Sequence, residues 1–138
     1  MKSYSTANWK GSGKEGSGTL TSKSKVLENT SYDFRSRFED GTYTNPEELV
    51  AAAHAGCFSM KLSFVLGGAG FTPDSLEATA TINLENGVIN ASHIVLKAKI
   101  PGIDNAKFQE LAAEAKTNCP VSVLLHQGLA ISLDAELL

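Results

Sequence analysis

The chain has few of the residues that mark secreted, nucleic-acid-binding or exported proteins. It contains two cysteines among 138 residues, too few for the disulfide framework of a small secreted domain. Its formal net charge is −3, which argues against a nucleic-acid interface. No signal-peptide h-region follows Met1, so we expect a cytoplasmic protein. In a reducing compartment, a single pair of cysteines is more often catalytic, redox-active or inert than structural.

The sequence also lacks internal repeats and low-complexity tracts, and its length suits one domain over residues 1–138. The first 43 residues predict a meander of strands, because a glycine-serine turn region separates extended segments. Residues 31–39 alternate between apolar and charged side chains. This alternation predicts a strand that carries Arg35 and Arg37 on one face.

The stretch from Thr44 to Gly68 is the longest apolar segment and predicts one long helix. Asn45 is a suitable N-cap, Pro46 suits the first helical position, and Glu48 can complete a capping box. The glycine pair at 67–68 is a plausible C-cap. Because nearly all faces of this helix are apolar or small, we expect it to be buried in the core. Its several polar side chains argue against a membrane span.

The second half of the chain predicts a hairpin followed by a helix pair and a last strand. Asn86-Gly87 indicates a type I′ turn, which needs positive φ at both positions. Asp104 is a suitable N-cap for the next helix, and Cys119, which precedes Pro120, is a suitable N-cap for a short one. Together these elements predict an antiparallel α+β domain. Strands are expected over residues 75–85, 88–100 and 129–137, and helices over residues 105–117 and 121–128.

The two cysteines differ in how their predicted local structure would stabilise a thiolate. Only the thiolate is a useful nucleophile. Cys119 could gain stabilisation from a helix N-terminus. Cys57 lies in mid-helix among apolar neighbours that would raise its pKa, so it needs a cation from elsewhere. The candidates are His54 and Lys61 on the same helix, and Arg35 and Arg37 from the preceding segment. Helix physics alone would make Cys119 the attacking thiol.

Five motifs then point to a known family. They are RFE at 37–39, TNPEEL at 44–49, AAAHAGCFSM at 51–60, GAGFTP at 68–73 and NCPVS at 118–122. With these motifs in this order the chain resembles the OsmC/Ohr family over essentially its whole length, and it is more similar to the OsmC branch. The resemblance implies an OsmC-like α+β fold, with antiparallel sheets packed around a long central helix in an intertwined homodimer.

The resemblance also implies a thiol-dependent peroxidase that reduces organic hydroperoxides to alcohols. Cys57 would attack the peroxide and become a sulfenic acid, and Cys119 would resolve it as a disulfide. An external dithiol, typically lipoyl-type in this family, would restore both thiols. Arg37 matches the arginine that stabilises the thiolate, and Glu47 matches the glutamate that orients that arginine. No cofactor, metal, nucleic acid or membrane is implied.

The position of Glu47 gives a reason to expect a homodimer with its sites at the interface. Glu47 precedes Cys57 by ten residues, or about 15 Å along one helix. It therefore meets that thiol within one chain only if the helix bends, whereas a partner chain could bring it there. The aromatic and aliphatic residues around the thiol predict a place for an apolar peroxide tail. These residues are Phe58, Met60, Leu62 and Phe64.

Three other functions remain open from the residues alone. His54 and Cys57, together with Cys119 and His126, could supply zinc ligands, although their spacings match no common zinc finger. A non-catalytic small-molecule binding protein would keep the pocket and tolerate loss of either thiol. A cysteine hydrolase is the weakest alternative, because no motif ties a histidine to either cysteine.

Overall fold

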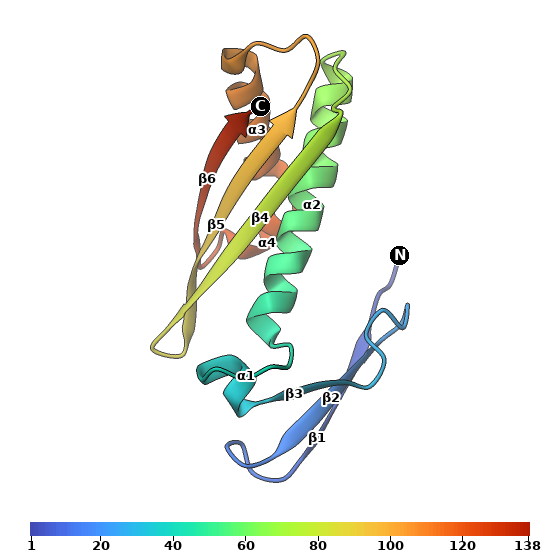
Figure 1. Ribbon diagram of the computed structural model, residues 1–138, viewed down its shortest axis with the longest axis vertical. Coiled ribbons are helices and arrows are strands. Elements are labelled where there is room, and N and C mark those ends of the chain that lie inside the picture. Colours follow the sequence, from blue (N-terminus) through green and yellow to red (C-terminus); the bar gives the residue numbers. More distant parts are fainter. The chain divides into compact units, whose positions relative to one another are not determined.

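The structure is a computed structural model that describes all 138 residues, and the chain forms two compact units, Met1–Leu49 and Val50–Leu138. Each unit contains a three-stranded sheet, with strand order β1-β2-β3 in the first and β4-β5-β6 in the second (Figure 1). The helices and strands confirm the predicted α+β class. A single domain over residues 1–138 stays a prediction.

The first unit is a small antiparallel meander with little buried surface. Its strands are β1 (Ser5–Lys10), β2 (Ser17–Ser22) and β3 (Thr30–Asp33), each paired with the next, which confirms the predicted meander. Every residue of β1 is exposed in the isolated chain. The rings of Trp9 and Tyr32 pack against each other at a centroid distance of 5.4 Å. Sheets this small normally need another surface to cover one face.

The predicted strand over residues 31–39 is wrong beyond Asp33, where α1 (Phe34–Phe38) begins. One carboxylate oxygen of Asp33 accepts hydrogen bonds from the backbone N–H of Ser36 at 2.8 Å and from its hydroxyl at 2.7 Å. This N-cap gives the backbone a helical turn in place of the sheet ladder, so local capping overrides the alternating pattern. The same bonds lower the pKa of Asp33. Arg35 and Arg37 therefore do not share a strand face.

The long helix α2 (Pro46–Gly68) begins where the sequence predicts. The side chain of Asn45 accepts a hydrogen bond from the backbone N–H of Glu48 at 2.8 Å, which confirms the N-cap. The Glu48 carboxylate accepts from the hydroxyl of Thr44 at 2.9 Å instead of reaching the N-cap backbone. The capping box is therefore half formed, with a threonine hydroxyl in place of the second backbone donor.

The same helix ends at Gly68, and the left-handed residue that follows it is Gly70, not a member of the glycine pair at 67–68. Gly70 adopts φ +87°, a left-handed conformation that favours glycine. Its N–H donates to the carbonyl of Gly67 at 3.1 Å, and the N–H of Phe71 donates to the carbonyl of Leu66 at 2.9 Å. These two bonds form a Schellman motif, in which the residue at C′ is Gly70.

The second unit contains a mixed sheet. Strands β4 (Ser75–Glu85) and β5 (Val88–Lys99) form an antiparallel hairpin. Asn86 and Gly87 have φ values of +51° and +76°, which confirms the type I′ turn. Strand β6 (Ala130–Leu137) pairs with β5 in parallel, so the expectation of antiparallel pairing is wrong for this strand. The chain reaches β6 through two helices, and such a crossover permits a parallel neighbour.

Those two helices are α3 (Asn105–Asn118) and α4 (Pro120–Leu125). The carboxylate of Asp104 accepts from the backbone N–H of Lys107 at 2.7 Å, which confirms the predicted N-cap of α3. Helices α2, α3 and α4 lie on one face of the sheet (Figure 1). The core between them contains apolar side chains from α2, β5 and α3. Its members include Phe58, Leu62 and Leu66 from α2, Ile94, Leu96 and Ala98 from β5, and Phe108, Leu111, Ala112 and Ala115 from α3.

Helix α2 is only partly buried in the single chain, which corrects the expectation of a fully buried helix. Its buried residues form one stripe, His54, Phe58, Leu62 and Leu66. Met60 and Phe64, on other faces, are 66% and 74% exposed. The helix is long and apolar enough to span a membrane by length and composition, a test that core helices also pass. Large exposed apolar side chains on a core helix form a surface that is available to a partner or a ligand.

The buried stripe of α2 predicts a specific stability effect. Leu62 is fully buried, so Leu62→Ala should lower the free energy of unfolding by about 2–5 kcal/mol through lost burial and a residual cavity. Leu138→Ala is the matched control, because it makes the same chemical change at a side chain that is 67% exposed. It should change stability by about 0.5 kcal/mol or less. Urea denaturation at one protein concentration measures both, and equal losses would contradict the packing described here.

Candidate functional site

The structure brings the two cysteines together in the second unit, and both are free thiols. Cys57 lies on α2 next to the buried stripe and is partly exposed. Cys119 is fully buried between α3 and α4. The Cys119 thiol lies close enough to Cys57 to raise the pKa of that thiol. A partly exposed thiol beside a buried one suits an attacking and a resolving cysteine.

The surroundings of Cys57 raise the pKa of its thiol. Burial has the largest effect, and the neighbouring Cys119 thiol raises the pKa further. The backbone N–H of Val121 and the charge of Lys61 lower it, but they do not reverse the net increase. Because a thiol with a raised pKa is mostly protonated at neutral pH, Cys57 needs a further cation to become a useful nucleophile. This agrees with its mid-helix position in the sequence.

Cys119 is the N-cap of α4, as the sequence predicts. Its sulfur accepts a hydrogen bond from the backbone N–H of Ser122 at 3.4 Å, and the Ser122 hydroxyl lies 3.5 Å from the same sulfur. One residue therefore directs two donors at Cys119. Hydrogen bonds to a sulfur stabilise its charged form.

His54 is connected to Cys119 through Ser122, an arrangement that the sequence did not reveal. The imidazole is fully buried, with Nδ1 2.6 Å from the hydroxyl oxygen of Ser92 and Nε2 2.8 Å from that of Ser122. Burial lowers the pKa of His54, so the ring is neutral at neutral pH and supplies no positive charge to Cys57. Ser92 carries no sequence signal, and Ser122 ends the NCPVS motif, but neither contact with His54 could be predicted because both depend on how β5 and α4 pack against α2.

Arg37 and Glu47 form an ion pair in the first unit. Arg37 donates to Glu47 Oε1 from both Nε, at 2.9 Å, and Nη2, at 2.8 Å. The other carboxylate oxygen, Oε2, is buried without a hydrogen-bond partner in the single chain. The guanidinium also lies over the ring of Phe38, 5.2 Å from its centroid. Because the carboxylate engages one edge of the guanidinium, it fixes the orientation of the other.

The remaining candidate cations, Arg35 and Lys61, are not paired with Glu47 as Arg37 is. Arg35 is exposed and pairs with Asp33 at 3.5 Å, so it is occupied within its own segment. Lys61 acts on Cys57 only through its charge. The structure contains no group of three or more histidine, cysteine or acidic side chains that could hold a metal ion. The zinc alternative therefore has no ligand cluster.

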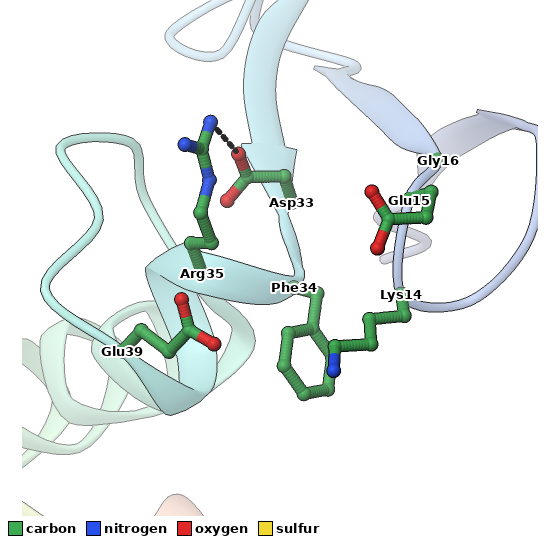
Figure 2. Close-up of a pocket in the computed structure, with 7 residues that line it drawn as sticks. All are labelled: Lys14, Glu15, Gly16, Asp33, Phe34, Arg35 and Glu39. Carbon is green, nitrogen blue, oxygen red and sulfur yellow. Dashed lines mark hydrogen bonds and ion pairs between the residues drawn. The ribbon is translucent and has the colours of Figure 1, made fainter.

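A polar hollow in the first unit is not the thiol site. It has a volume of about 380 Å³, and Figure 2 shows charged side chains on several sides of it. Arg35 is tied there to Asp33, and no cysteine is among the lining residues. The lining residues are Lys14, Glu15, Gly16, Asp33, Phe34, Arg35 and Glu39. Such mixed charge offers no surface to an apolar peroxide tail.

The second unit has a groove with more apolar walls, between α2 and α3. It has a volume of about 450 Å³ and is lined in part by Lys61, Phe64 and Leu111. Phe58 and Leu62 are fully buried in the core, so the expectation that they would contact a substrate tail is wrong. Met60 and Phe64 remain available on the exposed side of α2.

Comparison with known proteins places the chain in a family. Residues 39–134 match the family described as OsmC-like protein. The chain is 45% identical over 135 residues to Peroxiredoxin OsmC of Escherichia coli, with 95% of this chain and 93% of that protein covered. It is 28% identical over 100 residues to the Organic hydroperoxide resistance protein of Xanthomonas axonopodis pv. citri, with 67% of each chain covered.

The fold agrees with this relationship. An OsmC-like protein from Mycoplasma pneumoniae superposes with a TM-score of 0.78 at 14% identity, covering 100% of this chain and 98% of the other. An organic hydroperoxide resistance protein from Elizabethkingia anophelis superposes with a TM-score of 0.74 at 26% identity, covering 98% and 96%. By sequence and by fold, the chain belongs to the OsmC-like protein family, in its OsmC branch.

Proposed function

We propose that this protein is a cysteine-based peroxidase that reduces organic hydroperoxides to alcohols. The adjacency of Cys57 and Cys119 carries the proposal, because two free thiols within reach of each other suit a two-electron reduction that ends in a disulfide. Relatives named Peroxiredoxin OsmC and Organic hydroperoxide resistance protein support it.

The proposed reaction uses one thiol to attack and the other to resolve. The Cys57 thiolate attacks the terminal oxygen of the hydroperoxide, the O–O bond breaks, and the alkoxide takes a proton to leave as the alcohol. Cys57 is then a sulfenic acid. Cys119 attacks the sulfur of Cys57, the S–S bond forms, and the sulfenic oxygen leaves as water. An external dithiol of the lipoyl type reduces the disulfide and is itself oxidised to a disulfide.

The positive charge that Cys57 needs is assigned to Arg37, with Glu47 as the residue that orients it. The raised pKa of Cys57 requires a cation. One edge of the Arg37 guanidinium is held by Glu47, which leaves donors for a thiolate or a peroxide oxygen. Arginine suits this role because it does not deprotonate.

A homodimer with its sites at the interface would bring these groups to the thiol. Glu47 and Cys57 lie on the same helix, ten positions apart, which gives a rise of about 15 Å. The exposed Met60 and Phe64 of α2 offer apolar surface to a second copy, and strand β1 of the first unit is exposed along its whole length. In the proposed dimer, Arg37 and Glu47 of one chain serve Cys57 of the other. We place this dimer in the cytoplasm.

The first prediction from this proposal concerns the two thiols. One equivalent of an organic hydroperoxide should remove two free thiols from the wild-type protein. Cys57→Ser should abolish peroxide consumption, whereas Cys119→Ser should permit one attack and then leave Cys57 open to oxidation to a sulfinic acid. Thiol titration and mass spectrometry measure these outcomes.

The converse pattern would reverse the roles of the two cysteines. Sulfinic acid on Cys119 in the Cys57→Ser protein, with none on Cys57 in the Cys119→Ser protein, would make Cys119 the attacking thiol. No loss of thiols in the wild-type protein would favour a non-catalytic binding protein.

The second prediction concerns the shared site. Chains with Cys57→Ser and chains with Glu47→Ala should each be nearly inactive alone. Refolding them together should restore partial activity, because a mixed dimer pairs an intact Glu47 with the intact Cys57 of its partner. Peroxide consumption by purified, differently tagged heterodimers is the measurement. Inactive heterodimers would show that each site is built within one chain.

The third prediction concerns substrate choice. An alkyl or aryl hydroperoxide can bury its tail against exposed apolar side chains such as Met60 and Phe64, whereas hydrogen peroxide has no tail to bury. Each buried CH₂ contributes roughly 0.8 kcal/mol, so several should favour the organic substrate by a few kcal/mol after the costs of binding. We expect a preference of about 10²-fold or more in kcat/KM. Equal kcat/KM values for cumene hydroperoxide and hydrogen peroxide would contradict an apolar substrate site.

A further inference from the structure

We propose that His54 is a positioning residue for the resolving thiol of Cys119 and acts on it through the hydroxyl of Ser122. The inference rests on the proposed function and deepens it, because it assigns to the disulfide-forming step its own set of residues. The geometry that points to it is a continuous hydrogen-bonded series, Ser92–His54–Ser122–Cys119, in a buried part of the second unit.

Every residue of this hydrogen-bonded series is buried. Ser92, His54 and Cys119 are fully buried, and Ser122 is 1% exposed. Buried polar groups are stable only when they are hydrogen-bonded. Each ring nitrogen of His54 has a serine hydroxyl as its partner. The imidazole therefore has no free nitrogen for another role, and its position fixes the position of the Ser122 hydroxyl.

The direction of these hydrogen bonds decides how the series acts on the sulfur of Cys119. In a neutral imidazole one nitrogen donates and the other accepts. If Ser92 donates to Nδ1, then Nε2–H donates to the oxygen of Ser122, and the Ser122 hydroxyl donates to the sulfur of Cys119. The backbone N–H of Ser122 already donates to that sulfur. Two donors then converge on Cys119, an arrangement that fixes the position of its sulfur.

This arrangement serves the resolving step and not the first attack. Cys119 needs its thiolate only after Cys57 has become a sulfenic acid. The Cys119 sulfur then attacks the Cys57 sulfur, the S–S bond forms, and the S–O bond breaks. The departing hydroxide takes up the proton that the Cys119 thiol released, so the product is water. His54 stays neutral throughout, because it orients the hydroxyl and accepts no net proton.

The experiment separates the two chemical steps in a single turnover with cumene hydroperoxide. Rapid quenching, with dimedone to trap the sulfenic acid, measures both its formation on Cys57 and its conversion to the disulfide. In Ser122→Ala, formation should stay close to the wild-type rate. Conversion should slow by about ten-fold to a hundred-fold, the rate equivalent of one hydrogen bond to a charged group. Sulfinic acid on Cys57 should increase accordingly.

Three further variants test the role of positioning. Ser122→Thr keeps a hydroxyl and should retain most of the conversion rate. His54→Gln keeps an amide N–H near the position of Nε2 and should slow conversion less than His54→Leu, which removes every donor. Ser59→Ala is the matched control, because the hydroxyl of Ser59 donates to the Ala55 carbonyl at 2.9 Å and is not part of this hydrogen-bonded series. It should leave both steps unchanged.

Three results would overturn the inference. Unchanged conversion in Ser122→Ala would show that the hydroxyl does not act on Cys119. Equal slowing of both steps would indicate a general structural effect. A wild-type protein that loses no thiols would remove the proposed function, and the inference with it. The wild-type trace therefore distinguishes failure of the reaction from failure of this assignment.

Discussion

The packing of one stripe of α2 against β5 is the constraint on which the second unit depends. Residues at four-residue intervals on the helix, from His54 to Leu66, meet alternate residues of the strand, from Ser92 to Ala98. Most of this seam is apolar, and one end is polar, where His54 meets Ser92. Because Cys57 directly precedes Phe58, the seam holds its thiol at the edge of the core, beside Cys119.

In the proposed reaction, the two units of the chain supply different groups. The second unit supplies both thiols and the neutral hydrogen-bond donors around Cys119. The first unit supplies the oriented arginine, paired with a carboxylate at the first turn of α2. The partly exposed Cys57 thiol has a raised pKa and needs a cation to become a useful nucleophile. In the proposed dimer, this division would make reactivity depend on assembly.

Predictions from the sequence succeed where the signal is local. Asn45, Asp104 and Cys119 are N-caps in the structure, and Asn86-Gly87 forms the type I′ turn. Each of these depends on residues within a few positions of one another. The strand expected over residues 31–39 fails because the alternating pattern ignores the capping bond from Asp33 to Ser36. Parallel pairing of β6 escaped prediction because strand direction depends on the path of α3 and α4.

By itself, the sequence determined the α+β class, the long helix and the family, because capping residues, periodicity and motifs are written along the chain. Only the tertiary structure decided which groups meet. Cys57 meets Cys119, and His54 meets Ser122 across 68 residues, because α3 and α4 fold back over the sheet. It also decided that α2 buries one stripe and leaves large apolar side chains on other faces exposed, because apolar composition alone does not show which faces of a helix are covered.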